Sequence, residues 1–269
     1  MASFVKNPKR FAPPAILTGV FTVLCLGVCL TLPAALQAET TSAPHASADR
    51  MGEVPVGDAR TCSLVADLGS VHIVPVGANS TKIRYTVHLE TDAPEPLSQT
   101  LFDRFILNVR NSSDSVNLNG YLPRQRSASA RNAQFWVQYT LYVPANFSVN
   151  VHTGGGDIET GDIGGRAMLI TDGGNITTGR IGSGDHMMTV NGAPVAKVET
   201  QGGHITVLDV AGDIDAYTAG GFIQARDIAG NAKLRTGGGQ GAGPATALST
   251  SEGERWQSAG VRRFERDQP

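Results

Sequence analysis

The sequence predicts an all-β fold, in which a single-chain β-solenoid of about 18 residues per coil follows a small antiparallel β module. Three observations support this prediction: a phrase repeated at a fixed period, apolar residues that alternate with polar ones inside it, and paired glycines at its corners. The phrase T-x-G-G-x-(I/V/F)-x-x-x-(D/R)-(I/V)-x-G begins at Thr153, Thr171, Thr200 and Thr218, and a fifth copy opens at Thr236 and loses the pattern after Gly239. Regular repetition of one supersecondary unit indicates that the units stack on one another.

Each coil is expected to contain two or three short strands that turn at glycine corners. The sixth position of the phrase holds isoleucine in four copies, and polar residues such as Glu159 and Gln224 follow it. This alternation at period two is typical of a strand with one buried face. Glycine suits a corner because it tolerates a positive φ and a close backbone neighbour. The expected corner residues are Gly155, Gly156, Gly173, Gly174, Gly202, Gly203, Gly220 and Gly221.

The N-terminus has the composition of a secretory signal peptide. Lys6, Lys9 and Arg10 precede the apolar run Ala15–Leu32, and cleavage is expected after Ala38. An uncleaved membrane anchor remains an alternative, because the run is long enough to span a bilayer. The expected divisions are residues 1–38 as signal peptide, 39–58 as flexible tether, 59–151 as an N-terminal β module capping the solenoid, 152–239 as solenoid repeats, and 240–269 as a disordered tail with one extra strand left open.

Strands are also predicted within the N-terminal module. Ile83, Tyr85, Val87 and Leu89 alternate with polar residues, and the range Phe135–Val143 does the same. The stretch Leu97–Phe105 fits either a short helix or an irregular loop, and residues 184–194 interrupt the repeats as an insertion.

Charge and cysteine content restrict the partners. Losing the signal peptide removes three cationic residues and lowers the formal net charge from −2 to −5. A mildly acidic exported domain argues against nucleic acid or anionic lipid as a ligand. The chain after Ala38 retains only Cys62, so no intramolecular disulfide or cysteine metal cluster is expected, and Cys62 itself is expected to be a buried structural thiol.

Together these features resemble a bacterial family named "putative adhesin", which has β-strand repeats and an unknown function. The resemblance rests on the export signal, the strand Y-T-L-Y-V-P-A-N-F-S-V-N-V and the T-x-G-G-D-I-x-x-x-D-I-x-G coils, and it covers about Ala59–Gly239. It implies an envelope or extracellular β-solenoid, with envelope-stress signalling in some relatives. The family offers no catalytic residues to transfer to this chain.

One row of carboxylates could carry chemistry. Asp162, Asp209 and Asp227 share the tenth position and form a candidate surface binding face, although Arg180 interrupts the row and is expected to pair with its neighbours. A polysaccharide lyase or hydrolase needs a defined carboxylate pair beside a cleft, whereas aspartate beside a tight turn caps the local backbone. We favour the turn role, and we predict no catalytic residue.

No metal or cofactor site is predicted either. The fifth position changes from Asp157 through Asn175 and His204 to Phe222, a series that cannot build a repeated calcium cage. His152, His186 and His204 lack ligand spacing, and no nucleotide or nucleophile motif is present.

The predicted function is a non-enzymatic, adhesin-like binding module located in the periplasm, cell envelope or extracellular space. The alternatives are envelope-stress sensing, a self-assembling structural protein and, less favoured, the lyase or hydrolase. The expected partner is a glycan or an envelope or surface protein whose identity the sequence does not give. A membrane partner is expected only if the signal segment is uncleaved, and the sequence leaves the oligomeric state and the handedness of the solenoid open.

Overall fold

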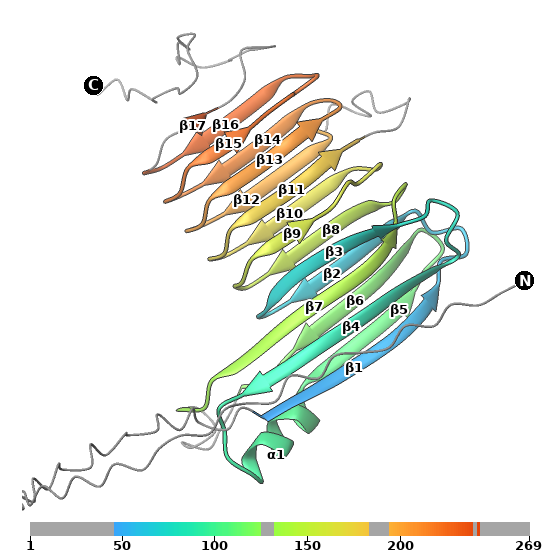
Figure 1. The fold of residues 1–269 in the computed structure, drawn as a ribbon, viewed down its shortest axis with the longest axis vertical. Helices are drawn as coiled ribbons and strands as arrows, with labels where there is room; N and C mark the ends of the chain where they lie inside the picture. The colour runs from blue at the N-terminus through green and yellow to red at the C-terminus, as the bar shows by residue number, and fades with distance from the viewer. Residues whose placement is uncertain (1–45, 125–131, 183–193, 239–240, 243–269) are drawn as a thin grey trace, which may run out of the picture. The chain divides into compact units, whose positions relative to one another are not determined.

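A computed structural model describes residues 46–124, 132–182, 194–238 and 241–242, and it confirms the all-β class. Two sheets and one short helix make up this described part (Figure 1). The elements in chain order are β1 (Ala46–Pro55), β2 (Thr61–Ala66), β3 (Ser70–Val76), β4 (Lys82–Thr91), α1 (Leu97–Arg104), β5 (Ile106–Asn111), β6 (Ser115–Tyr121), β7 (Phe135–Pro144), β8 (Ser148–Thr153), β9 (Ile158–Thr160), β10 (Ala167–Thr171), β11 (Ile176–Ile181), β12 (Ala196–Thr200), β13 (Ile205–Val210), β14 (Ile214–Thr218), β15 (Ile223–Ala225), β16 (Ala232–Thr236) and β17 (Gly241–Ala242).

The two sheets are mixed and not closed. Sheet A has nine strands in the order β1-β4-β7-β3-β9-β11-β13-β15-β17, and sheet B has eight in the order β16-β14-β12-β10-β8-β2-β6-β5. Strand β4 is antiparallel to β1 and β7, and β5 is antiparallel to β6. The N-terminal module is therefore not purely antiparallel as predicted, because β2 lies parallel between β6 and β8, and β3 lies parallel between β7 and β9.

The predicted register of the repeats is confirmed. Ile158, Ile176, Ile205 and Ile223 are successive partners in sheet A, and the eighth positions align beside them. In sheet B, Leu169 aligns with the seventeenth-position residues of the following copies. Each copy therefore contributes one parallel strand to each sheet, and the apolar side chains at its sixth, eighth, eleventh and seventeenth positions are buried in the core.

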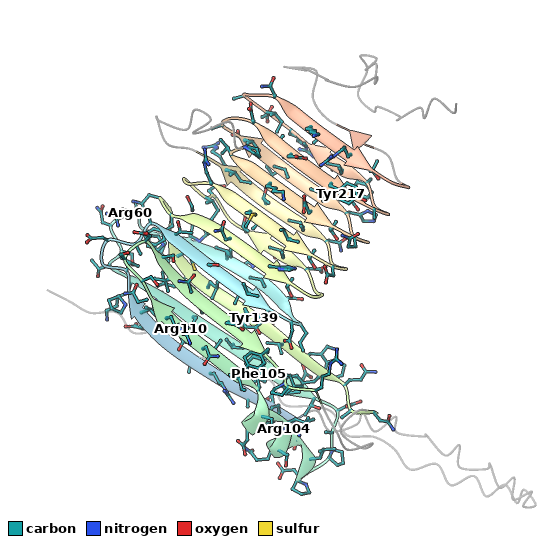
Figure 2. All side chains as sticks on the ribbon, turned by 180° about the vertical axis from the view of Figure 1, so that it is seen from behind. Arg60, Arg104, Phe105, Arg110, Tyr139 and Tyr217 are labelled. Atoms are coloured by element: carbon teal, nitrogen blue, oxygen red, sulfur yellow. The ribbon has the colours of Figure 1, made fainter. Side chains whose placement is uncertain are left out.

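The same interior continues into the N-terminal strands. Tyr139 on β7 is completely buried, and Gly120 on β6 leaves space for its ring, because a Cβ at Gly120 would overlap the phenol. Figure 2 shows Tyr139 and Phe105 inside this part of the fold. Burial is the main cause that raises the pKa of the Tyr139 hydroxyl, and the charge of Asp67 adds to it. One apolar core therefore extends from the N-terminal strands through the repeats.

The expected flexible tether is wrong for residues 46–55, which form β1 and pair along their whole length with β4. The inward-facing positions of β1 hold alanine, Arg50, glycine and a single valine, so the sequence lacks the apolar alternation that would reveal a strand. Arg50 donates to the carbonyl oxygens of Phe102 (2.5 Å) and Phe105 (2.8 Å) at the end of α1, and its guanidinium lies 5.5 Å from the centre of the Phe105 ring. The helical alternative for Leu97–Phe105 is confirmed by α1, which covers Leu97–Arg104.

At the other end, Gly241 and Ala242 form β17 within the range expected to be a disordered tail, and they pair with Ile223 and Gln224. The predictions for the signal peptide, for residues 184–193 of the insertion and for Val261–Arg266 fall outside the described residues. Within the described ranges, no helix is both long and apolar enough to cross a membrane.

Candidate functional site

The paired glycines lie in the turns that lead from sheet B to sheet A. The third and fourth positions of the repeated phrase, which they occupy, differ in the space available for a side chain. A Cβ at Gly155 or Gly173, in the third position, would meet no atom within 4 Å, and at Gly202 it would meet Gly173 O at 3.7 Å. At the fourth position, Gly174, Gly203 and Gly221, it would overlap the backbone of the preceding copy. Of the eight predicted corner glycines, only Gly156 has a positive φ, 112°. Close approach, rather than a left-handed backbone, therefore explains Gly174, Gly203 and Gly221, whereas at Gly156 both reasons apply.

Threonine hydroxyls join the copies at these turns, a role that we did not infer from the sequence. The ladder consists of Thr153, Thr171, Thr200, Thr218 and Thr236. Thr200, for example, donates to Gly174 O of the preceding copy (2.8 Å) and accepts the N–H of Gly203 in its own copy (3.2 Å). The threonine that opens every copy was the available signal, but its hydroxyl partners become visible only when neighbouring copies are in place.

A second ladder runs along the fifth position on the outer face of sheet A. Asp157 Oδ1 accepts the N–H of Asn175 (2.7 Å), Asn175 Oδ1 accepts that of His204 (2.9 Å), and His204 Nδ1 accepts that of Phe222 (3.1 Å). The His204 and Phe222 rings stack with centroids 3.9 Å apart. The side chains of Asp157, Asn175 and His204 thus accept a hydrogen bond from the backbone N–H of the next copy. The described residues contain no group of three His, Cys, Asp or Glu side chains that could hold a metal ion.

The tenth-position aspartates form a similar row. Asp162 Oδ1 accepts the backbone N–H of Arg180 (2.9 Å), and Arg180 Nε pairs with Asp209 Oδ2 (2.9 Å), as expected for a cation that interrupts the row. Asp227 has a φ of 47°, the left-handed conformation that aspartate tolerates in turns. The structure therefore brings Asp162 and Asp209 to the same arginine, and each of these two carboxylates contacts a neighbouring copy. Their predicted role in capping the local turn stays a prediction.

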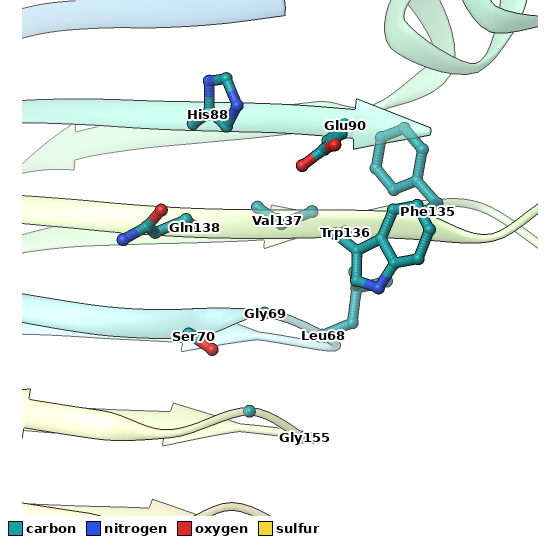
Figure 3. Close-up of a pocket in the computed structure, with 11 residues that line it drawn as sticks. Leu68, Gly69, Ser70, His88, Glu90, Phe135, Trp136, Val137, Gln138 and Gly155 are labelled. Atoms are coloured by element: carbon teal, nitrogen blue, oxygen red, sulfur yellow. The ribbon is translucent and has the colours of Figure 1, made fainter. Parts of the chain in front are cut away.

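A groove of about 680 Å³ lies elsewhere, over the end of sheet A where β7 begins (Figure 3). Its lining comes from β4, β7, the first residue of β3 and the turns before β3 and β9, namely Leu68, Gly69, Ser70, His88, Glu90, Phe135, Trp136, Val137, Gln138, Gly155 and Gly156. Trp136 is 42% exposed, although it is a large aromatic residue.

Strand pairing positions the polar groups of the groove. Glu90 is the cross-strand partner of Trp136, and Gln138 lies between His88 on one side and Ser70 on the other. His88 Nδ1 is 2.7 Å from Asp49 Oδ1, an interaction that orients the imidazole. An indole next to a carboxylate, an imidazole, an amide and a hydroxyl can bind a polar ligand that also has an apolar face.

Sequence reasoning did not identify this groove. The alternation of Phe135–Val143 already indicates an outward Trp136, but nothing in the sequence pairs Glu90 with it, because β4 and β7 are separated by α1, β5 and β6. Shifted pKa values also occur elsewhere in the described residues. The hydrogen bond from Lys82 lowers the pKa of the exposed Glu53. Burial raises the pKa of the Cys62 thiol to about 12, as expected for a structural cysteine, and partial desolvation is the main cause that raises the pKa of the exposed Asp67.

No protein-family model and no curated protein matches the sequence. Solved structures show similarity at low identity. A "putative cell adhesion protein" from Clostridium sporogenes is 12% identical with a TM-score of 0.39, covering 74% of this chain and 98% of that one. A "putative adhesin" from Bacteroides fragilis is 10% identical with a TM-score of 0.32, covering 73% and 95%. A "putative lipid binding protein" from Parabacteroides distasonis is 10% identical with a TM-score of 0.26, covering 74% and 95%.

Proposed function

We propose that this protein is an exported, non-enzymatic β-solenoid that binds a surface or envelope component, in the manner of an adhesin, through the outer face of sheet A. The observation that carries the proposal is the groove beside Trp136, which opens on a face made of rows of polar side chains. Rigid sheets position such side chains well, because every strand is held by its neighbours.

The solenoid itself is part of the proposal. Successive strands from β8 to β16 alternate between the two sheets and stay in register with the preceding copy, and the threonine ladder links consecutive turns. These contacts support coils that wind around one core. Export is supported by the basic and apolar character of residues 1–38.

The non-enzymatic assignment is supported by the way carboxylates are used. Glycoside hydrolysis requires two carboxyl groups flanking the scissile bond. The described lining of the groove contains a single carboxylate, Glu90, and Asp162 and Asp209 both contact Arg180. A binding role needs only the shape and the hydrogen-bonding groups of the groove.

The test begins with export. The full chain is expressed with its N-terminus intact, and its cleavage and location are determined by fractionation and N-terminal sequencing. The exported protein is then immobilised and exposed to isolated cell envelopes and to purified cell-wall and capsular glycans, with urea-unfolded protein as control. Saturable binding that requires the folded state is expected, and its absence for every envelope fraction and glycan would contradict the proposal. Sedimentation of the same sample as a monomer would exclude the self-assembling alternative.

A further inference from the structure

We propose that the groove beside Trp136 is a carbohydrate subsite, in which one neutral sugar ring lies on the indole and its hydroxyls bond to the polar side chains around it. This inference rests on the proposed binding function and names the ligand class. Its starting point is a large aromatic side chain that remains 42% exposed beside a polar groove.

The position of Trp136 is fixed by its strand. The next residue, Val137, is only 4% exposed and belongs to the core, so alternation along β7 forces the indole to the outer face. The π face of an indole attracts the positively polarised C–H groups on the apolar face of a pyranose ring. A sheet that holds the ring in one orientation reduces the ordering cost of binding.

Polar groups surround the indole on neighbouring strands. Glu90 on β4 is directly opposite Trp136, and the row His88, Gln138 and Ser70 crosses β4, β7 and β3. Adjacent strands are about 4.8 Å apart, so hydroxyl groups on one or two sugar rings can reach several of these side chains. The set includes both acceptors and donors, as the hydroxyl groups of a sugar require.

Other ligand classes fit this groove less well. A peptide cannot be added as a strand here, because β7 is hydrogen-bonded to β4 on one side and to β3 on the other. A polyanion is disfavoured, because the described lining has a carboxylate, Glu90, and no lysine or arginine. These observations favour a neutral glycan.

The glycines of the lining provide a matched pair of variants. Gly155 lines the groove, and a Cβ there would meet no atom within 4 Å, so a side chain can be added without moving the backbone. Gly173 occupies the same position one copy further on, has the same free space and does not line the groove. Gly155→Gln should obstruct the subsite, whereas Gly173→Gln should leave it unchanged.

The probes are cellotetraose, the N-acetylglucosamine tetramer, maltotetraose and mannotetraose, with tetragalacturonate as the anionic control. The chain has 2 tryptophans, so Trp256→Phe leaves Trp136 as the only indole, and its fluorescence reports on ligands at this position. We expect a saturable change in emission with at least one neutral tetrasaccharide and none with tetragalacturonate. By calorimetry, Trp136→Ala and Gly155→Gln should each weaken that binding by about tenfold or more, and Trp136→Phe and Gly173→Gln by much less.

Urea melts of each variant establish that it is folded. The subsite is refuted if none of the four neutral probes binds, or if Trp136→Ala and Gly155→Gln both bind as the unsubstituted protein does. If the protein then still binds envelopes, the binding function stands and only the location or ligand class is wrong. If no envelope binds either, both proposals fail.

Discussion

Replacing Gly203 by alanine should destabilise the repeats strongly, whereas the same change at the adjacent Gly202 should not. Both glycines have backbone φ values outside the left-handed region, so conformational strain does not distinguish them. Their surroundings do. A Cβ at Gly203 would overlap the Gly174 carbonyl of the preceding copy, while a Cβ at Gly202 would have its nearest neighbour, Gly173 O, at 3.7 Å.

The magnitude follows from the bonds at this contact. Relieving the overlap must separate two turns that are joined by the Thr200 hydroxyl to Gly174 O (2.8 Å) and by the His204 N–H to Asn175 Oδ1 (2.9 Å). Losing these bonds costs about 1 kcal/mol each, and forcing extra volume into a packed contact adds about 1–3 kcal/mol. We therefore expect Gly203→Ala to lower the free energy of unfolding by about 3–5 kcal/mol.

Gly202→Ala should instead be neutral or stabilise by up to about 1 kcal/mol, since alanine restricts the unfolded chain. Urea melts followed by circular dichroism give both values by linear extrapolation. If the two variants had the same midpoint, the close approach of fourth-position glycines would not be what holds consecutive turns together. Gly221→Val should behave like Gly203→Ala, because its Cβ would overlap the Gly203 carbonyl, and the outward-facing Gln224→Ala should change stability by about 0.5 kcal/mol or less.

Three further predictions concern Thr200, Cys62 and Asp67. Thr200→Val keeps the side-chain shape but leaves the Gly174 carbonyl and the Gly203 N–H without their hydroxyl partner, so the free energy of unfolding should fall by about 1–3 kcal/mol. Thr206→Val, on the outer face, is the control. Equal urea midpoints for the two variants would argue against the threonine ladder. Because burial raises the pKa of Cys62 to about 12, a thiol reagent at neutral pH should label it only after unfolding in a Cys25→Ser, Cys29→Ser background; rapid native labelling would show that the strand opens. Partial desolvation raises the folded-state pKa of Asp67, so ionisation of its carboxylate lowers stability as the pH rises through that pKa. Asp67→Asn should therefore lose less stability than the unsubstituted protein between pH 4 and 7. Parallel curves of stability against pH would be inconsistent with that shift.

The repeats could be predicted well because the same residue types recur at the same positions in every copy. Isoleucines at the sixth position fixed the register, and the structure aligns Ile158, Ile176, Ile205 and Ile223 as partners. The threonine ladder remained hidden, because a hydroxyl can bond to its own turn or to a neighbour, and sequence does not distinguish the two.

The N-terminal strands were harder to predict, because their pairing is not sequential. Strand β1 has Arg50 at an inward position, where α1 carbonyls accept its hydrogen bonds, and no periodicity rule anticipates such a residue. The groove depends on the same non-local pairing. Glu90 and Trp136 become neighbours only because β4 pairs with β7.

Because later strands lie on both sides of β2 and of β3, the strand order of the sheets imposes an order on assembly. Strand β2 needs β6 on one side and β8 on the other, and β3 needs β7 and β9, all of which leave the ribosome later. Residues 61–76 therefore wait with unsatisfied edges until the chain has been made as far as β9. Every later strand in each sheet pairs with the edge strand that the preceding copy has already formed. The slow, long-range step of folding thus lies in the N-terminal half, and chains that end before β9 are the species most exposed to aggregation.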